Sequence, residues 1–311
     1  MPDFLNLNEL SRNELTDIVS HAIKSKKGMR PTSIENESNP RPLNGKIVAM
    51  IFDKPSTRTR VSFDVGIKQL GGQSLILSGS DIHLGHGESI SDTAKVLSRY
   101  VDLIIIRTFE EDALYELAKN ADVPIINGLT NSTHPCQSMA DVMTFEELRG
   151  PITGKNVLWL GDGNNVCAST LHAAGQFGFN FTFSGPESLN PEPKYLEYAK
   201  NKKISVNIDL DPENAVKNAD LIMTDTWSSM HDQKESNYEA RQRQLMPFQV
   251  NEKLISKSKD DAIFMHCLPA YRGQEVTSDV IDGIKSVVFD QAENRLHIQK
   301  SILEWCILGK L

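Results

Sequence analysis

Hydroxyl and arginine side chains gather in the stretch Ser56-Thr57-Arg58-Thr59-Arg60, which follows the apolar run Ile47–Phe52. The apolar run predicts a buried strand, and Phe63, Ile67 and Leu70 recur behind the stretch at helical spacing. Ser56 is therefore expected at a helix N-terminus, where free backbone N–H groups and the helix dipole favour an anion. Arginine adds fixed positive charge, so the stretch predicts a site for a phosphate or a similar dianion.

Two further polar side chains are expected at the same edge of the same sheet. Arg107 directly follows the mostly apolar run Asp102–Ile106. His134 lies between the expected strand Val123–Asn127 and a helix that runs to about Arg149. Ligands gather at the carboxyl ends of strands in open parallel sheets. These side chains are therefore candidates for the same anion site.

The two motifs resemble the aspartate and ornithine carbamoyltransferase family. Ser-Thr-Arg-Thr-Arg is similar to the carbamoyl phosphate loop of that family. Thr133-His134-Pro135-Cys136-Gln137 is similar to the segment in which a histidine and a glutamine hold the carbamoyl group. The resemblance implies a two-domain α/β fold over the whole chain.

Polar residues also follow the strands expected in the second half of the chain. Gly161-Asp162-Gly163-Asn164-Asn165 follows the run Val157–Leu160, and Asp225 follows the run Asp220–Thr224. A dinucleotide site is disfavoured because Val166 replaces the third glycine of the usual motif. Asn165 is an amide donor and acceptor that suits the carboxylate or amine of a small substrate, and Asp225 predicts a site for a cationic substrate. The polar residues from 231 to about 245 predict a long loop that closes the site.

In this half the chain resembles the ornithine carbamoyltransferases within the family. The stretch Asp225–Met230 resembles the loop that closes over the amino acid, although His231 replaces the usual glycine, and His266-Cys267-Leu268-Pro269 resembles a second motif. Adjacent His266 and Cys267 also suggest a thiol nucleophile and its base. Neighbours on an extended segment point to opposite faces, which argues against that pair.

The resemblance implies the residues of both substrate sites. For carbamoyl phosphate they are Ser56, Thr57, Arg58, Thr59, His83, Arg107, His134, Pro135, Cys136, Gln137, Cys267, Leu268 and Arg295. For L-ornithine they are Asn165, Asp225, Ser229 and Met230, and the expected catalytic residues are Arg58, Arg107, His134 and Cys267. The implied reaction carbamoylates the side-chain amine of L-ornithine, giving L-citrulline and phosphate in arginine biosynthesis. Neither a metal nor an organic cofactor is implied.

The length of 311 residues predicts two domains of about 150 residues each, and residues 150–154 (Gly-Pro-Ile-Thr-Gly) are typical of a hinge. The resemblance implies two doubly wound α/β domains with parallel sheets and the active site in the cleft between them. Residues 1–149 with the C-terminal helix 291–311 are expected to bind carbamoyl phosphate, and residues 150–290 to bind L-ornithine. The helix returns to the first domain and brings Arg295 to the phosphate. His83 stands where the family commonly has a glutamine that reaches a neighbouring subunit, which implies a homotrimer or a multiple of trimers.

Composition excludes several other classes of protein. A net charge of −8 argues against a general nucleic-acid binder, which needs a broad basic face. No apolar run is long enough for a membrane span, and the N-terminus lacks the pattern of a signal peptide, so a cytoplasmic protein is expected. The four cysteines form neither a CxxC motif nor a close Cys/His cluster, which predicts no disulfide framework and no zinc site.

Two alternatives stay open at this stage. One is the same chemistry on another amine, such as putrescine or an N-acylated ornithine. The other is a non-enzymatic protein of this fold that binds an amino acid or phosphate. Asn165 and the pair Ser229-Met230 argue for recognition of an α-carboxylate, which putrescine lacks.

Overall fold

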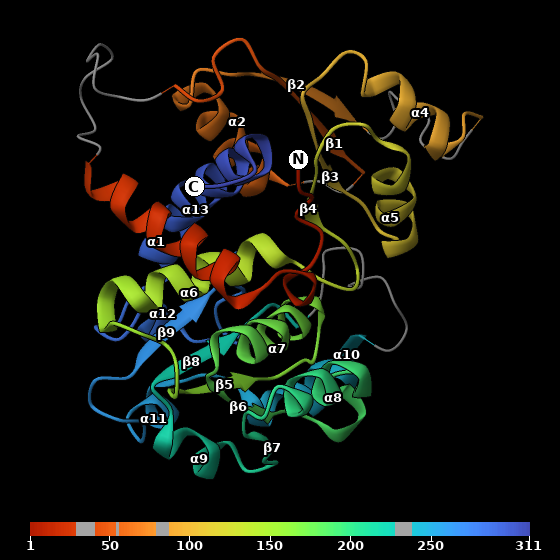
Figure 1. The fold of residues 1–311 in the computed structure, drawn as a ribbon. Coiled ribbons are helices and arrows are strands. Elements are labelled where there is room, and N and C mark those ends of the chain that lie inside the picture. The colour runs from red at the N-terminus through yellow and green to blue at the C-terminus, as the bar shows by residue number, and fades with distance from the viewer. Residues whose placement is uncertain (29–40, 54–55, 79–86, 228–237) are drawn as a thin grey trace. The chain divides into compact units, whose positions relative to one another are not determined.

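The computed structural model describes residues 1–28, 41–53, 56–78, 87–227 and 238–311, and these form two compact units (Figure 1). Unit 1 comprises Met1–Met143 and Glu293–Leu311, and unit 2 comprises Thr144–Ala292. No helix among the described residues is long and apolar enough to cross a membrane.

Unit 1 contains a four-stranded parallel sheet in the order β2-β1-β3-β4. Its strands are β1 (Ile47–Phe52), β2 (Gln73–Ser78), β3 (Leu103–Arg107) and β4 (Ile125–Leu129). Its described helices are η1 (Leu7–Glu9), α1 (Arg12–Gly28), α2 (Thr57–Gln69), α4 (Ile90–Leu97), α5 (Glu111–Asn120) and most of α6 (Pro135–Arg149) and α13 (Val288–Leu308).

Helices cover both faces of this sheet. Ile51 and Ile106 pack in one hydrophobic cluster with Ala94 of α4 and Leu114 of α5. Successive side chains of a strand point to opposite faces, so the buried Met50 faces the other side, where α2 and α13 lie (Figure 1). The expected doubly wound arrangement is confirmed in unit 1.

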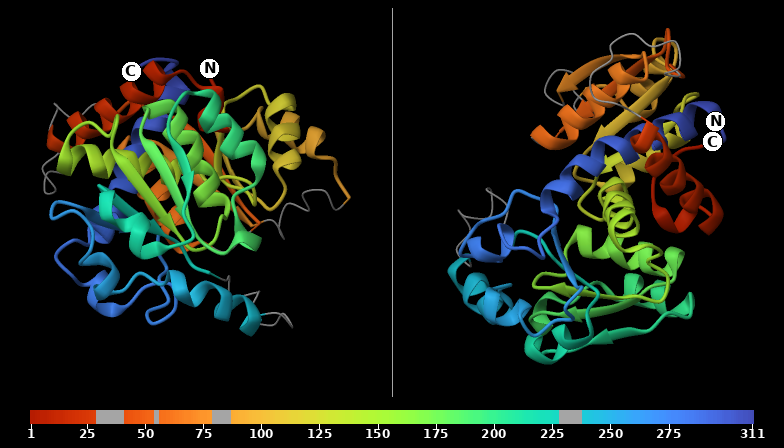
Figure 2. Two further views of the ribbon diagram at one scale, coloured as in Figure 1. Left: turned by 90° about the horizontal axis from the view of Figure 1, so that it is seen from below. Right: turned by 90° about the vertical axis from the view of Figure 1, so that its left-hand side faces the viewer.

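The C-terminal helix α13 packs on α1 within unit 1. The N-terminus of α1 has the expected capping box, in which Ser11 N donates to Glu14 Oε2 at 2.8 Å and Glu14 N donates to Ser11 Oγ at 3.2 Å. Ser301 Oγ of α13 donates to the carbonyl oxygen of Ile18 at 2.8 Å, and Figure 2 shows α1 and α13 side by side. The predicted return of the C-terminal helix to the first domain is confirmed.

Unit 2 contains a five-stranded parallel sheet in the order β7-β6-β5-β8-β9. Its strands are β5 (Asn156–Leu160), β6 (Asn180–Ser184), β7 (Val206–Ile208), β8 (Leu221–Thr224) and β9 (Ile263–His266). Its described helices include α7 (Asn165–Phe177), η2 (Glu187–Leu189), α8 (Pro193–Asn201), α9 (Pro212–Ala215), η3 (Val216–Asn218), α10 (Tyr238–Leu245), η5 (Met246–Phe248), α11 (Glu252–Ile255) and α12 (Ser278–Ile281). On one face, Leu160 and Phe264 share a core with Leu254 of α11 and Val280 of α12.

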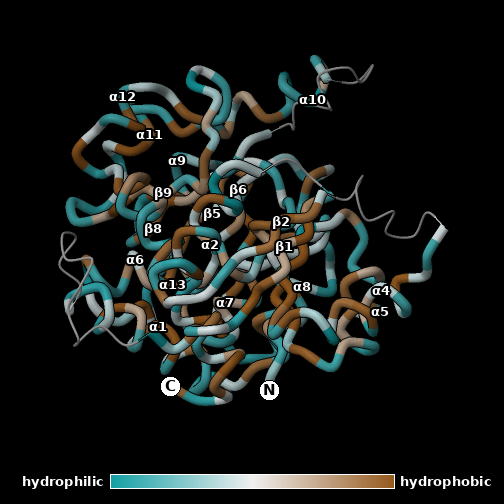
Figure 3. Tube along the Cα trace, turned by 90° about the horizontal axis from the view of Figure 1, so that it is seen from above, coloured by the Kyte–Doolittle hydropathy of each residue, from teal (hydrophilic) through white to brown (hydrophobic). Residues whose placement is uncertain are grey.

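The loop predicted from residue 231 to about 245 is wrong in its last part, because Tyr238–Leu245 is the helix α10. Residues 231–237 lie outside the described part of the chain. Helix α10 is mostly hydrophilic (Figure 3), and Leu245 is its one buried residue. A helix without an apolar stripe carries no hydrophobic periodicity, so the sequence pattern could not reveal it.

In each unit the chain leaves the middle of the sheet in two directions. In unit 1 it runs from β1 outward to β2, and then from β3 outward to β4. In unit 2 it runs from β5 through β6 to β7, and then from β8 to β9. The topological switch points therefore lie between β1 and β3 and between β5 and β8, where open parallel sheets bind ligands beyond the carboxyl ends of their strands.

Candidate active site

Four side chains meet at the switch point of unit 1. Arg295 of α13 donates from Nη2 to Thr59 Oγ1 at 2.5 Å and from Nη1 to Gln137 Oε1. Arg107, the last residue of β3, donates from Nη1 to the same Thr59 oxygen at 3.5 Å. Thr59, Gln137 and Arg295 are buried. Helices α2, α6 and α13 and strand β3 thus bring together Arg107, which was predicted from its place at a strand end, and Arg295, which the family resemblance implied. We call these four residues with His134 the unit 1 cluster.

His134 lies beside both arginines. Its side chain is buried, and burial, followed by the positive charges of Arg295 and Arg107, lowers the pKa of His134 well below 6.5. The imidazole is therefore neutral at pH 7, when it offers one N–H donor and one acceptor nitrogen. Such a group suits an uncharged polar ligand atom better than a second anion.

The N-terminus of α2 lies next to this cluster in the chain. Ser56 is the N-cap in extended conformation, and its side chain makes no cap hydrogen bond with the helix. Thr57 and Arg58 follow in the first turn, and both are exposed. The backbone N–H groups of this turn and the Arg58 guanidinium are thus available to an anion.

Pro135 and Cys136 begin α6, but the Cys136 side chain does not face a ligand site. Its Sγ donates to the carbonyl oxygen of Asn127 at 3.4 Å, and burial raises the pKa of this thiol to about 12. A contact between Cys136 and carbamoyl phosphate would therefore use the backbone.

Gln137 donates from Nε2 to Asp141 Oδ1 at 2.8 Å, and Asp141 is a buried residue that the motifs did not identify.

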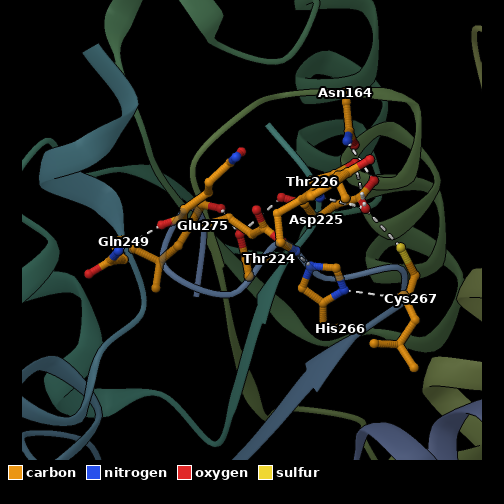
Figure 4. A network of polar contacts seen from close by, with 12 residues as sticks. Asn164, Thr224, Asp225, Thr226, Gln249, His266, Cys267 and Glu275 are labelled. Atoms are coloured by element: carbon orange, nitrogen blue, oxygen red, sulfur yellow. Dashed lines mark hydrogen bonds and ion pairs between the residues drawn. The ribbon is translucent and has the colours of Figure 1, made fainter. Parts of the chain in front are cut away.

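Asp225 is the centre of a second group, at the switch point of unit 2 (Figure 4). Its Oδ1 accepts from Thr226 N at 2.7 Å and from Cys267 Sγ at 2.9 Å, and its Oδ2 accepts from Asn164 Nδ2 at 2.7 Å. The carboxylate is thereby fixed at the end of β8, and its remaining lone pairs suit a cationic ligand.

The side-chain amide of Asn164 contacts Asp225. Asn164 is the N-cap of α7, and its Oδ1 accepts from Val166 N at 3.0 Å and from Cys167 N at 3.1 Å. Asn165 is the first residue of the helix. The sequence analysis missed Asn164, although an Asn before a helical run is a recognised cap signal.

His266 and Glu275 form a buried pair that supports the turn after β9. Leu268 N donates to His266 Nδ1 at 2.9 Å, so the ring proton is on Nε2, which lies 3.2 Å from Glu275 Oε1. Tyr271 N also donates to Glu275 Oε1, at 2.6 Å. Leu268 has a positive φ of 55°, which is uncommon outside glycine. The pair holds this conformation, and nothing in the motifs indicated Glu275.

The structure corrects the expectation of no close Cys/His cluster. One possible ligand atom from each of Asp225, His266 and Cys267 lies within 4.8 Å of the others. They are this close because β8 and β9 are neighbours and Cys267 follows the end of β9. Hydrogen bonds already engage both nitrogens of His266 and the Cys267 thiol. The imidazole therefore has no nitrogen left to act as a base on the thiol, and the cluster needs no metal to explain its geometry.

Arg241 of α10 ties this helix to the loop that precedes α7. Its Nη2 donates to Asp162 Oδ2 at 2.6 Å, and its Nε donates to the carbonyl oxygen of Trp227 at 3.0 Å. Trp227 is buried, and its indole lies against Gly161. Of the other residues predicted from the sequence, His83, Ser229 and Met230 lie outside the described residues.

Comparisons with known proteins agree with this arrangement. Residues 2–147 match the family described as "Aspartate/ornithine carbamoyltransferase, carbamoyl-P binding domain", and residues 153–306 match "Aspartate/ornithine carbamoyltransferase, Asp/Orn binding domain". The chain is 59% identical over 309 residues to an ornithine carbamoyltransferase of Cereibacter sphaeroides, covering 99% of each chain. It is 57% identical to that of Roseobacter denitrificans, again over 99% of each.

Solved structures give the same result. The ornithine carbamoyltransferase from Pyrococcus furiosus superposes with a TM-score of 0.91 at 45% identity, covering 100% of this chain and 98% of that one. The protein of that name from Burkholderia thailandensis gives a TM-score of 0.89 at 42% identity, with 100% of both chains covered. The chain therefore belongs to the aspartate/ornithine carbamoyltransferase family, and within it to the ornithine carbamoyltransferases.

Proposed function

We propose that this chain transfers the carbamoyl group of carbamoyl phosphate to the side-chain amine of L-ornithine, forming L-citrulline and phosphate. The chemistry of the two switch points carries the proposal. Arg107 and Arg295 converge on Thr59 in unit 1, which suits a phosphorylated substrate, and the Asp225 carboxylate is fixed in unit 2, which suits a cationic amino acid. The full-length similarity to ornithine carbamoyltransferases supports the same assignment.

We assign carbamoyl phosphate to unit 1. The phosphate is bound by the N-terminus of α2, from Ser56 to Thr59, and by the two arginines of the unit 1 cluster. His134 and Gln137 bind the carbamoyl group, for which a neutral imidazole and an amide are suitable partners. The location of Arg58 in the first turn of α2 supports a contact with the phosphate.

We assign L-ornithine to unit 2. Asp225 orients the side-chain amine, and Asn165, Ser229 and Met230 bind the amino-acid end. Cys267 and Leu268 lie near the reacting atoms, held by Asp225 and by the His266–Glu275 pair. Thr226 N and Asn164 also fix Asp225, so its direction does not depend on the thiol alone.

The proposed reaction is a direct attack of the neutral amine on the carbamoyl carbon. The amine resembles that of lysine, with a pKa of about 10.4, so only about one molecule in 10³ is neutral at pH 7. The arginines and helix dipole stabilise the charge that develops on the phosphate as it leaves, and His134 does the same at the carbonyl oxygen. Orientation of the amine by Asp225 supplies the remaining help, because a carboxylate favours the charged amine rather than deprotonating it.

A colourimetric assay for a carbamoylated product tests the proposal. Enzyme and carbamoyl phosphate are incubated with L-ornithine, putrescine or N-acetylornithine in parallel. The proposal is supported if product forms with L-ornithine and not with the other two amines. Preferred reaction with putrescine or N-acetylornithine would assign another amine, and no product with any of them would support a non-enzymatic binding protein.

We also propose a homotrimer, because His83 stands where the family has a residue that reaches a neighbouring subunit. Light scattering of the active enzyme tests the assembly, and an active monomer would exclude it. A cytoplasmic location and a role in arginine biosynthesis stay predictions from the sequence and the family resemblance.

A further inference from the structure

Gln137 and Asp141 are neighbours on α6, one helical turn apart. Gln137 is fully buried and Asp141 is 4% exposed, and Gln137 Nε2 donates to Asp141 Oδ1 at 2.8 Å. On the other side of the amide, Arg295 Nη1 donates to Gln137 Oε1. The amide thus has a partner on each side, and the two partners differ in kind.

The chemistry of these partners permits one orientation of the amide. A guanidinium only donates hydrogen bonds, and the Asp141 oxygen beside the amide accepts one from it. The NH₂ group of Gln137 must therefore face Asp141, and its oxygen must face Arg295. Turning the amide by 180° would place donor against donor and acceptor against acceptor inside a buried site, which is strongly unfavourable.

A carbonyl oxygen has two lone pairs, and Arg295 uses one of them. The second can accept an N–H from a ligand. When Arg295 contacts a bound phosphate, as proposed above, Asp141 becomes the partner that keeps the amide oxygen toward the ligand.

We propose that Asp141 is a positioning residue that acts through Gln137 and selects carbamoyl phosphate over acetyl phosphate. The two acyl phosphates have almost the same shape, but the first has an NH₂ group where the second has a methyl group. A fixed acceptor stabilises bound carbamoyl phosphate through a hydrogen bond from the NH₂ group. Acetyl phosphate cannot form this bond, because its methyl group would face the buried oxygen of Gln137. The inference rests on the proposed function, because it assumes that Gln137 faces the carbamoyl group.

Two substitutions of Asp141 test this role with different strength. Asp141→Leu removes the acceptor and keeps the branching at Cγ, and Asp141→Asn keeps a carbonyl oxygen but also offers a donor, so that the amide is held less firmly. The readout is the affinity for carbamoyl phosphate relative to the inhibition constants of acetyl phosphate and inorganic phosphate. We expect Asp141→Leu to weaken carbamoyl phosphate about 10- to 100-fold and the other two less than about threefold. Asp141→Asn should give a smaller loss in the same direction.

Gln137→Met provides the background that separates positioning from general damage. If Asp141 acts through Gln137, Asp141→Leu should not lower the selectivity further once Gln137 is methionine. Asp64→Asn is the matched charge control, since Asp64 is a carboxylate of unit 1 whose hydrogen-bond partners are Lys68 Nζ, at 2.8 Å, and Ser74. Its selectivity should equal that of the wild type.

Equal losses for all three ligands in Asp141→Leu, or an unchanged effect in the Gln137→Met background, would overturn the inference. If Asp141→Leu shows no cooperative thermal unfolding, Asp141→Asn decides, and an unchanged selectivity in that variant also overturns it. Absence of citrulline with the wild-type enzyme would instead count against the proposed function. In that case the role of Asp141 is tested by calorimetry, which compares the affinities of the wild type and the Asp141 variants for carbamoyl phosphate and acetyl phosphate.

Discussion

The thiol of Cys267 donates a hydrogen bond to Oδ1 of Asp225, with 2.9 Å between sulfur and oxygen, although the two residues are 42 positions apart. The donor is the protonated thiol, not the nucleophilic thiolate. The geometry therefore favours a Cys267 that positions the carboxylate over a Cys267 that becomes carbamoylated.

Cys267→Ser should keep this donor in weakened geometry, so kcat should fall about 10-fold while citrulline still forms. Labelled carbamoyl phosphate mixed with wild-type enzyme alone should leave no label on the protein, and activity should rise with pH as more amine becomes neutral. Stable label on Cys267, with a burst of phosphate before ornithine is added, would establish the covalent route instead.

Arg58→Ala should lower kcat/KM for carbamoyl phosphate about 10- to 100-fold, because a charge-assisted contact with the phosphate is lost. Arg60 is an equally exposed arginine of the same helix start and is the matched control. Arg60→Ala should change kcat/KM less than about threefold. Equal effects of the two substitutions in steady-state kinetics would show that only the general positive charge matters.

Arg241→Ala should raise the KM for ornithine about 10-fold and leave the KM for carbamoyl phosphate nearly unchanged. The substitution removes the hydrogen bonds from α10 to Asp162 and to the Trp227 carbonyl. Asp162 lies just before Asn164 in the chain and Trp227 just after Asp225, so these bonds help to hold both of those residues in place. Arg243 is exposed on the same helix, is ion-paired with Glu239 at 3.8 Å, and serves as the control. An Arg243→Ala variant with the same rise in KM would contradict the specific role of Arg241.

His134 should stay neutral throughout the range in which ordinary histidines titrate, because burial and two arginines lower its pKa well below 6.5. Its NMR signal, assigned by comparison with His134→Asn, should not shift between about pH 5.5 and 8. That variant should lose about 100-fold in kcat, since a donor to the carbonyl oxygen is displaced. A His134 signal that titrates near pH 6.5 would refute this electrostatic account.

His172 should make the protein sensitive to acid. The ring lies between Tyr195 and Tyr198, with centroid distances of 5.2 and 4.9 Å, and burial, then Lys194, lowers the pKa of His172 to about 4. The unfolded chain takes up the proton first, near pH 6.5, so stability is complete above that pH and falls as the pH drops toward 4.

The loss is about 2 kcal/mol at pH 5 for this one group. His172→Phe keeps the aromatic contacts without the titration, so its thermal midpoint should fall less between pH 7 and 5 than that of the wild type. Identical falls in the two proteins would assign the acid sensitivity to other groups.

The strands and the helix starts could be predicted because they depend on local pattern. The apolar run before Ser56 became β1, and Arg107 lies at the end of β3 as expected. These features depend on burial and periodicity, which the sequence carries directly.

Other site features could not be predicted because they depend on contacts between distant positions. Glu275 faces His266 only after the turn beyond β9 has formed, and Arg241 lies on a helix without an apolar stripe. Asp141 could have been found, because it lies four positions after Gln137 on an expected helix, where side chains are neighbours.

Unit 1 is discontinuous along the chain, since Glu293–Leu311 join it after the whole of unit 2. A ribosome therefore completes unit 2 before it supplies the segment that packs on α1 and gives Arg295 to Thr59. Every residue of unit 2 is synthesised while unit 1 still lacks Glu293–Leu311. The contact between Arg295 and Thr59 is consequently among the last that synthesis can supply, and a nascent chain released before Arg295 lacks this part of the unit 1 cluster.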